Sequence, residues 1–248
     1  MKAIVLAAGV ASRLRPLTDT IPKCLLDVGG RTILGRTLDG LRAQGVTDVI
    51  LVTGYRDAQI RADIAEHHED LHIAFVHNRD FAATNNIYSF WLALKETGDD
   101  DILLLDSDIV FDDRIIGALL QSGRPNCLAV TTGKVLGEEE IKVRVDGNRE
   151  ILQIGKDVPP AEAFGESIGI EKFSRDCRRP LFSIVDEMIV REGMVNVFYE
   201  AAFQRVIDSK TGSLAAVDVT ELACIEVDTV DDLTAARVRV APAIDKKR

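Results

Sequence analysis

The run A-I-V-L-A-A occupies residues 3–8 and is followed by Gly9. A short, uninterrupted apolar run is typical of a strand that is buried on both faces, and the glycine predicts a loop at its end. Strands of this kind belong to parallel sheets that carry helices on each side. Residues 3–8 therefore predict the first strand of a parallel sheet in an α/β protein.

Helical and strand patterns alternate downstream of this run. Apolar side chains at helical spacing predict a helix over 33–41, and residues 48–54 predict the next strand, with a loop at its carboxyl end. The alternation continues with a helix near 58–64, a strand at 72–77, a helix at 87–94 and a strand at 102–105. This order predicts a doubly wound, mainly parallel sheet.

The pattern changes after residue 126. Residues 141–145 alternate in polarity, and a turn leads from them into 151–154, which predicts an antiparallel hairpin. Further predicted elements are strands at 127–132, 164–173 and 224–227, and helices at 181–191, 196–209 and 230–238. We therefore expect a three-layer α/β/α sandwich with a mainly parallel, Rossmann-like mixed sheet and an antiparallel hairpin in the second half.

Composition excludes several classes of protein. Of the 248 residues 46% are hydrophobic, and 40 Asp and Glu against 30 Lys and Arg give a net charge of −10, which argues against binding to nucleic acid or to an anionic membrane. No apolar run reaches the roughly 18 residues of a membrane span, and the first residues lack the apolar core of a signal peptide, so we expect a cytoplasmic protein. The cysteines form no C-x-x-C pair, which predicts reduced thiols rather than zinc ligands or disulfides: Cys24, Cys127, Cys177 and Cys224.

The loop after the first strand carries basic side chains. Residues 9–23 contain neither the G-x-G-x-x-G pattern of dinucleotide-binding loops nor the G-K-[ST] ending of a P-loop. A loop at the carboxyl end of a buried strand nevertheless exposes backbone N–H groups, and Arg13 and Lys23 add positive charge there. These features predict a site for a polyphosphate. The alternative is a surface loop with incidental basic residues.

Carboxylates follow two of the predicted strands. Asp106 and Asp108 flank Ser107 directly after the strand at 102–105, and two carboxylates at this spacing can face one cation such as Mg²⁺. Asp228 follows the strand at 224–227 and would approach the same region if that strand lies in the sheet. The alternative is a solvated turn, because Asp and Ser favour turns.

The first loop matches a known motif. The motif L-A-A-G-x-G-[ST]-R-L-x-P-x-T-x-x-x-P-K belongs to nucleotidyltransferases of the sugar-nucleotide pyrophosphorylase type, which this chain resembles at Leu6-Ala7-Ala8-Gly9, Ser12-Arg13-Leu14, Pro16, Thr18 and Pro22-Lys23. One position departs from the motif, because its second glycine is Ala11 here. Alanine adds a Cβ beside the expected phosphates, so we expect the loop to avoid a positive φ at Ala11 or to shift slightly.

The resemblance implies a role for several residues. Asp108 and Asp228 would hold Mg²⁺, Arg13 would neutralise the leaving β- and γ-phosphates, and Lys23 would stabilise charge at the α-phosphate of a nucleoside triphosphate. The nucleotide would lie against Leu6, Ala7, Ala8, Gly9, Ser12, Asn85, Asn86 and Asp106, in a nucleotide-binding half of about 1–125 within a single domain of residues 1–248. Asn85 and Asn86 open a predicted helix, and the alternative role for such a residue is helix capping.

Other segments indicate which nucleotidyltransferases this chain resembles. Asn85-Asn86-Ile87-Tyr88-Ser89, Phe198-Tyr199-Glu200-Ala201 and Ile225-Glu226-Val227-Asp228-Thr229 are similar to segments of bacterial CTP:phosphocholine and CTP:2-aminoethylphosphonate cytidylyltransferases, as is Lys156 after the hairpin. The acceptor-binding half would then span about 126–248, with Lys156 on the phosphate or phosphonate and Glu200, Tyr199 or Glu166 on the amine. Burial of Tyr199 beside Phe203 and Val206, and simple solvation of Lys156, are the alternatives.

The sequence therefore predicts a Mg²⁺-dependent cytidylyltransferase that joins CMP to a small phosphorylated or phosphonylated acceptor bearing an amine. CTP and this acceptor are the expected partners, a homodimer is allowed for, and neither nucleic acid nor a membrane is expected. Two alternatives stay open: a sugar-1-phosphate nucleotidyltransferase that uses UTP, dTTP or GTP, and a non-catalytic nucleotide-sensing module. The intact set Arg13, Lys23, Asp108 and Asp228 argues against the sensing module.

Overall fold

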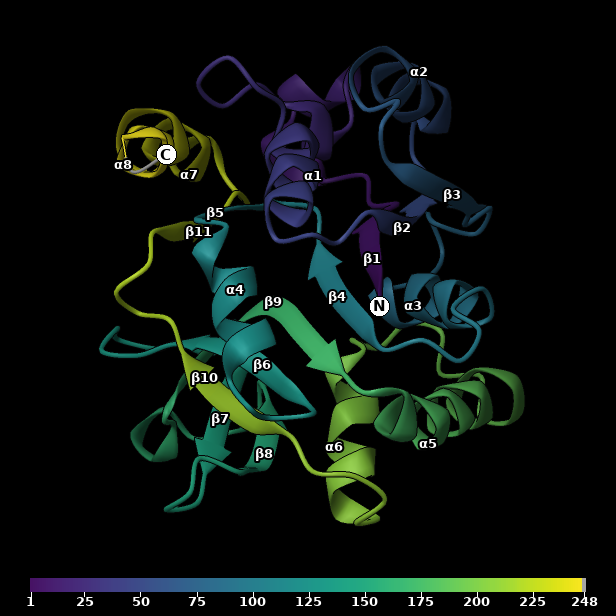
Figure 1. Cartoon of the computed structure of the whole chain (residues 1–248), viewed down its shortest axis with the longest axis vertical. Helices are drawn as coiled ribbons and strands as arrows, with labels where there is room; N and C mark the ends of the chain where they lie inside the picture. Colours follow the sequence, from purple (N-terminus) through teal and green to yellow (C-terminus); the bar gives the residue numbers. More distant parts are fainter. Residues whose placement is uncertain (247–248) are drawn as a thin grey trace.

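A mixed β-sheet forms the centre of the protein in the computed structural model, which describes residues 1–246 (Figure 1). Its main path has the order β10-β6-β9-β4-β1-β2-β3, and β7 and β8 extend it from β9. The strands are β1 (Lys2–Ala7), β2 (Asp48–Thr53), β3 (His72–His77), β4 (Ile102–Asp106), β6 (Cys127–Thr131), β7 (Lys142–Val145), β8 (Ile151–Gly155), β9 (Gly165–Phe173) and β10 (Ala215–Asp218).

The register of the parallel strands places the polar segments together. β1 lies between β2 and β4 and is parallel to both, with Ala7 opposite Thr53 and Leu6 opposite Asp106. The loop that starts at Gly9 and the carboxylates after β4 therefore leave the sheet at the same edge. This arrangement confirms the mainly parallel sheet that the sequence predicts.

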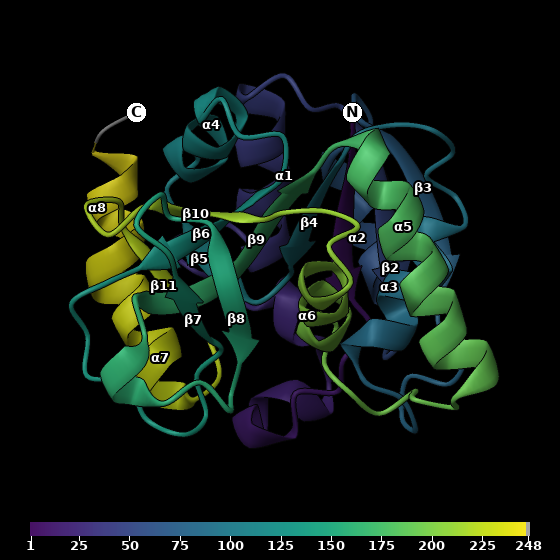
Figure 2. The ribbon, with the colours of Figure 1, turned by 90° about the horizontal axis from the view of Figure 1, so that it is seen from below.

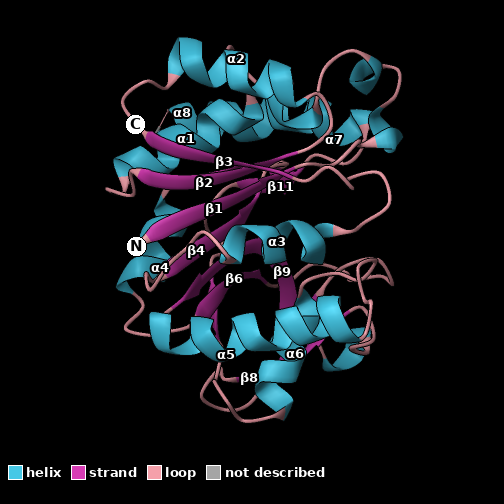
Figure 3. Ribbon diagram, turned by 90° about the vertical axis from the view of Figure 1, so that its right-hand side faces the viewer, coloured by secondary structure: helices cyan, strands magenta, loops and turns pink. Residues whose placement is uncertain are grey.

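Helices cover both faces of the sheet (Figure 3). Side chains of β1 alternate between the faces: Val5 packs with α1, α2 and α4, whereas Ile4 packs with α3, α5 and α6. Burial on both faces explains why β1 is apolar throughout its length. The helices are α1 (Ile33–Ala43), α2 (Asp57–His67), α3 (Asn86–Leu94), α4 (Arg114–Gln121), α5 (Arg175–Asp186), α6 (Glu200–Asp208), α7 (Val230–Ala235) and α8 (Ala241–Asp245).

The second half of the chain adds antiparallel strands. β9 is antiparallel to both β4 and β6, and β7 and β8 form the predicted hairpin, with β7 also paired to β9. The sequence patterns do not predict α4, β10 or β5 (Ile109–Phe111), since each is only three to eight residues long.

Two predicted helices have different boundaries in the structure. α5 begins at Arg175 rather than at residue 181, because the Ser174 side chain accepts a hydrogen bond from the Cys177 N–H and caps the helix. α6 begins at Glu200 rather than at residue 196. The Val195 carbonyl and the Tyr199 N–H instead bond to the start of α3, so this segment is not helical.

The late strand β11 (Cys224–Glu226) does not join the central sheet. It pairs antiparallel with β5 in a separate two-stranded sheet, beside α7 and α8 (Figure 2). Because β5 starts just after Asp108, the end of β11 still reaches this residue, and the Val227 N–H donates to the Asp108 carbonyl at 2.9 Å. The sequence predicted that Asp228 would approach Asp108 if its strand lay in the main sheet. Asp228 does lie near Asp108, but its strand belongs to the small two-stranded sheet.

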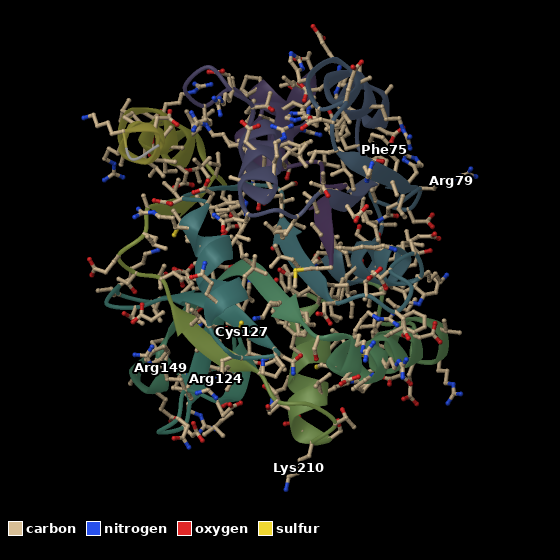
Figure 4. All side chains as sticks on the ribbon, viewed as in Figure 1. Phe75, Arg79, Arg124, Cys127, Arg149 and Lys210 are labelled. Atoms are coloured by element: carbon tan, nitrogen blue, oxygen red, sulfur yellow. The ribbon has the colours of Figure 1, made fainter. Side chains whose placement is uncertain are left out.

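All four cysteines are free thiols. Cys127, labelled in Figure 4, lies at the start of β6 and is fully buried, and only Cys224 is partly exposed. This agrees with the predicted absence of disulfides. Among residues 1–246, no helix is both long and apolar enough to cross a membrane.

Candidate active site

A cleft of about 1020 Å³ opens where β1 and β4 end. It has two ends, which we define by their side chains. The loop end contains Arg13, Lys23, Asp108, Glu226 and Asp228, and the hairpin end contains Lys134, Glu139, Lys156, Glu166, Phe198 and Glu200. The cleft therefore joins the two halves of the chain.

The loop after β1 keeps a left-handed residue where the motif has glycine. Ala11 has φ 51° and ψ 55°, so of the two expected outcomes the first, a loop that avoids a positive φ at this position, is wrong. The conformation costs about 1–2 kcal/mol for a residue with a Cβ. The Ala11 carbonyl offsets part of this cost by accepting hydrogen bonds from the Thr18 hydroxyl at 2.9 Å and the Leu14 N–H at 3.1 Å.

The same loop contributes backbone to the cleft. Of the residues predicted to contact nucleotide there, four line the cleft and Ser12 is not among the lining residues: the four are Leu6, Ala7, Ala8 and Gly9. Ser12 begins a short 3₁₀ turn that ends at Leu14. The turn carries Arg13 into the cleft.

Lys23 and Arg13 meet the two predicted metal ligands. The Lys23 Nζ lies 2.9 Å from Asp108 Oδ2 and 2.7 Å from Asp228 Oδ1, and an Arg13 guanidinium nitrogen lies 2.7 Å from Asp228 Oδ2. Burial opposes the charge on Lys23, but Asp108 and Asp228 outweigh it and raise the Lys23 pKa. Burial likewise opposes the charge on Asp228, whose pKa is nevertheless lowered by Lys23 and Arg13. Lys23 and Asp228 are thus held in their charged forms.

Glu226 is a third carboxylate at the loop end. One oxygen each from Asp108, Glu226 and Asp228 lie within 4.8 Å of one another, a set of hard oxygen donors that suits Mg²⁺. Burial, then Asp108 and Asp228, raise the Glu226 pKa to about 8. The prediction from sequence omitted Glu226, although residues two apart in an extended segment share a face, which places it on the side of Asp228.

Asp106 contacts the core residue Tyr199. Its carboxylate accepts a hydrogen bond of 2.8 Å from the Tyr199 hydroxyl, and burial, followed by Asp108 and Glu200, raises its pKa well above the usual range. Asp106 lines the cleft but is not one of the three clustered carboxylates.

Tyr199 is buried, which corrects the expectation that it contacts an acceptor. Its exposed fraction is 0%, its ring packs against Phe90 and Phe203, and it is not among the residues that line the cleft. The alternative, burial beside Phe203 and Val206, is the observed arrangement. The neighbouring Phe198 is 41% exposed and supplies the aromatic ring at the hairpin end.

Asn85 and Asn86 connect the start of α3 to the segment that contains Tyr199. The Asn85 side chain caps α3 by accepting a hydrogen bond of 2.7 Å from the Asn86 N–H. The Asn86 side chain accepts one of 3.0 Å from the Tyr199 N–H. Both residues also line the cleft, so they combine a capping or linking role with exposure to a bound ligand.

The hairpin end combines basic and acidic side chains from separate elements. The Lys156 Nζ follows β8 and lies 2.7 Å from Glu139 Oε2 and 4.9 Å from the centre of the Phe198 ring. Glu166 on β9 pairs with Lys134 at 3.3 Å. Glu200 is only 6% exposed, its Oε2 has no hydrogen-bond partner, and burial raises its pKa to about 7.

Arg239 is a further basic residue in the cleft that the sequence did not single out. It lies in the turn Ala236–Val240 between α7 and α8 and lines the cleft with Arg13 and Lys23. No sequence motif links positions so far apart. The arginines labelled in Figure 4 are instead outside the lining of the cleft: Arg79, Arg124 and Arg149.

Comparisons with known proteins identify the family of this chain. Residues 3–141 match the family model of the MobA-like NTP transferase domain. The chain is 30% identical over 258 residues to CMP-5'-(3-aminopropyl)phosphonate synthase of Streptomyces rubellomurinus, which covers 100% of this chain and 40% of that protein. It is 26% identical to 2-aminoethylphosphonate cytidylyltransferase of Lancefieldella rimae, over 94% of this chain and 90% of that protein.

A solved structure shares the fold. The CTP:phosphocholine cytidylyltransferase of Streptococcus pneumoniae superimposes with a TM-score of 0.77 at 19% identity, over 100% of this chain and 99% of that chain. The fold class predicted from the sequence is therefore confirmed.

Proposed function

This chain belongs to the MobA-like NTP transferase family, and we propose that it is a Mg²⁺-dependent cytidylyltransferase. It transfers CMP from CTP to a small acceptor that carries a phosphate or phosphonate and a cationic nitrogen, and it releases pyrophosphate. One observation carries the proposal: a single cleft joins two cations and three clustered carboxylates at its loop end to a lysine and a buried carboxylate with one unpartnered oxygen at its hairpin end.

The reaction needs no nucleophilic side chain. An ionised oxygen of the acceptor's phosphate or phosphonate attacks the α-phosphorus of CTP and forms a P–O–P bond. The bond from the α-phosphorus to the oxygen that bridges to the β-phosphorus breaks, and its electron pair leaves with pyrophosphate. Positioning and neutralisation of charge supply the catalysis of such transfers.

The basic residues of the loop end have matching roles. Lys23, buried beside Asp108 and Asp228, neutralises charge at the α-phosphate. The Arg13 side chain is 68% exposed and is free to turn from Asp228 toward the β- and γ-phosphates of the leaving group. Arg239 adds positive charge on the same side of the cleft.

The three clustered carboxylates would hold the metal ion. Asp108 and Asp228 are its expected ligands and Glu226 is a third donor within reach. When bound, Mg²⁺ supplies neutralisation of the triphosphate charge and orients the reacting groups. The ammonium of Lys23 lies between two of these carboxylates, which supports a site built for positive charge.

The hairpin end would bind the acceptor. Lys156 is a point charge suited to a phosphate or phosphonate, and its present partner, Glu139, is an exposed side chain that an anion can displace. Glu200 suits the cationic nitrogen. The choice of CTP is supported by the names of the two relatives above, both of which refer to CMP or cytidylyl transfer.

Pyrophosphate release tests the proposed function. The purified protein is incubated with Mg²⁺, each of CTP, UTP, GTP, ATP and dTTP, and each of 2-aminoethylphosphonate, phosphocholine and glucose 1-phosphate. We expect release with CTP and a nitrogen-bearing acceptor. Release confined to glucose 1-phosphate with UTP, dTTP or GTP would establish the sugar-1-phosphate alternative, and CTP binding without any release would favour the sensing module.

A further inference from the structure

We infer that the hairpin end of the cleft recognises a primary ammonium rather than a quaternary one, and that Glu200 is the carboxylate that receives it. The inference rests on the proposed function, because it concerns the acceptor of that reaction. It selects one chemical class of acceptor: a short alkyl chain with a primary amine at one end and a phosphonate or phosphate at the other.

The state of the Glu200 carboxylate is the first observation. The residue lines the cleft, yet it is only 6% exposed and its Oε2 has neither a partner nor contact with water. A buried carboxylate in this state is costly unless a cation or an N–H donor compensates it. A primary ammonium brings a charge and three N–H donors, whereas a trimethylammonium brings a charge and no donor.

Groups near Glu200 are already engaged with other partners. Asp106 accepts a hydrogen bond of 2.8 Å from the Tyr199 hydroxyl, and the Lys156 ammonium lies 2.7 Å from Glu139 Oε2. The Oε2 of Glu200 therefore lacks a donor that a bound ligand can supply.

The aromatic rings of the cleft are the second observation. Quaternary ammonium groups are bound in cages of several aromatic faces. Among residues 1–246, the cleft is lined by two aromatic rings, those of Phe81 and Phe198. Phe81 lies beside Gly54 and Ala8, at the end of β1, so it is not part of the hairpin end.

The remaining ring is already engaged. The ammonium of Lys156 lies 4.9 Å from the centre of the Phe198 ring, so a quaternary group would have to compete with a resident cation for one face. Tyr199, which would complete an aromatic site, is turned into the core. The hairpin end therefore has the donors and charges for a primary ammonium and lacks the cage for a quaternary one.

Lys156 and Glu200 line the same end of the cleft. An acceptor that reaches both residues carries an anionic group at one end and an ammonium at the other. Aminoalkyl phosphonates and phosphoethanolamine have this form.

A methylation series tests the inference by binding. Phosphoethanolamine, its N-methyl and N,N-dimethyl derivatives and phosphocholine have the same phosphate and three, two, one and no N–H donors. Their affinities are measured by calorimetry with Mg²⁺ and a CTP analogue that cannot release pyrophosphate. We expect the affinity to fall along the series, with phosphocholine at least about tenfold weaker than phosphoethanolamine. Equal or tighter binding of phosphocholine would overturn the inference.

Substitution of Glu200 gives the second measurement. Glu200→Gln keeps the shape of the side chain and removes its charge. It should weaken the binding of phosphoethanolamine by about tenfold or more and the binding of phosphocholine much less, so that the variant no longer discriminates between the two acceptors. Glu138→Gln, on an exposed residue of a nearby loop that does not line the cleft, is the matched control. Discrimination that survives in Glu200→Gln, with the melting temperature of the wild type, would contradict the assignment of Glu200.

Turnover in parallel samples separates this inference from the proposed function. Pyrophosphate release from CTP with phosphocholine preferred keeps the cytidylyltransferase and overturns the primary-ammonium inference. Tight, selective binding of primary ammonium acceptors without pyrophosphate release supports the inference and overturns the transfer reaction.

Discussion

The two ends of the cleft differ in how the chain builds them. The loop end takes Arg13 and Lys23 from one segment after β1, and its charges are already paired: Lys23 contacts Asp108 and Asp228 at 2.9 and 2.7 Å. The hairpin end draws on the β6–β7 connection, β8, β9 and the start of α6, and leaves the buried carboxylate of Glu200 without a partner at Oε2.

This difference corresponds to two parts of the proposed reaction. The loop end would bind the triphosphate, as any nucleotidyl transfer requires, and the hairpin end would select the acceptor. Any nucleotidyl transfer needs cations and carboxylates around a triphosphate. The loop end already has both kinds of group, and its lysine and arginine contact its aspartates. An acceptor site must instead leave groups unsatisfied until the right ligand supplies what they lack. Changes at the loop end should therefore affect every acceptor, and changes at the hairpin end should affect acceptors selectively.

The largest effect is expected from Asp108→Asn. Loss of one carboxylate charge at the proposed Mg²⁺ site should lower kcat/KM about 10³-fold for all acceptors alike, because neutralisation at the triphosphate is weakened. Steady-state kinetics with two different acceptors measures this effect. Asp176→Asn, an exposed change on α5, is the control, and a loss of less than about tenfold in Asp108→Asn would remove this residue from the site.

Lys23→Met should lower kcat about 10²-fold and increase the affinity for a metal ion. Without nucleotide, the Lys23 ammonium occupies the space between Asp108 and Asp228, so its removal should tighten Mn²⁺ binding by about tenfold. Electron paramagnetic resonance of free Mn²⁺ measures this without turnover. Unchanged or weaker binding would show that Lys23 does not compete with a cation there.

At the hairpin end, Lys156→Ala should be selective for one substrate. Loss of a charged contact to the acceptor anion should raise the KM of the acceptor about 10- to 30-fold and leave the KM of CTP within about twofold. Lys210→Ala, at the remote turn after α6 in Figure 4, serves as control. Equal increases of both KM values would place Lys156 at the nucleotide instead.

The buried carboxylate of Glu200 should also affect stability. Burial raises the Glu200 pKa to about 7 in the folded protein, above the ordinary glutamate value of 4.5, so folding favours the neutral form. This contribution is complete below about pH 4.5 and is lost as the pH rises through about 7, at about 1.4 kcal/mol for each unit of difference in pKa.

Thermal unfolding of the free protein between pH 5 and pH 8 measures this contribution. We expect the melting temperature of the wild type to fall by a few degrees more than that of Glu200→Gln, which cannot ionise. Parallel melting curves for the two proteins would contradict a raised pKa.

The smallest effect is expected from Ala11→Gly. Glycine adopts the left-handed conformation of residue 11 without the cost of a Cβ, but it also increases the entropy of the unfolded chain. The net gain should be about 0.5 kcal/mol, a rise of about 1–2 °C in melting temperature. A lower melting temperature would show that the contacts of the Ala11 methyl group outweigh the strain.

The sequence predicts the loop end better than the hairpin end for a physical reason. The residues from Leu6 to Lys23 are local, so a fixed spacing is visible, and the apolar runs of β1 and β4 imply that their carboxyl ends meet. Glu226 was missed although its spacing of two residues from Asp228 places both side chains on one face of an extended segment, whereas the pairing of its strand with β5 has no local signal.

The hairpin end depends on contacts between distant segments. The position of Tyr199 in the core is set by Asn86 and Asp106, which lie 113 and 93 residues away in the chain. The start of α6 at Glu200 follows from the same contacts, and no local pattern distinguishes the exposed Phe198 from its buried neighbour. Sequence spacing therefore identified a segment that lines the cleft, but Tyr199, the ring it singled out, is buried in the core.

A competition experiment compares the three acceptor classes in one sample. The protein is mixed with Mg²⁺, CTP and equal amounts of 2-aminoethylphosphonate, phosphocholine and glucose 1-phosphate, and the products are followed by ³¹P nuclear magnetic resonance. We expect 2-aminoethylphosphonate to be consumed first, with matching signals from pyrophosphate and a new P–O–P linkage to CMP. Preferential consumption of phosphocholine or glucose 1-phosphate would contradict this expectation.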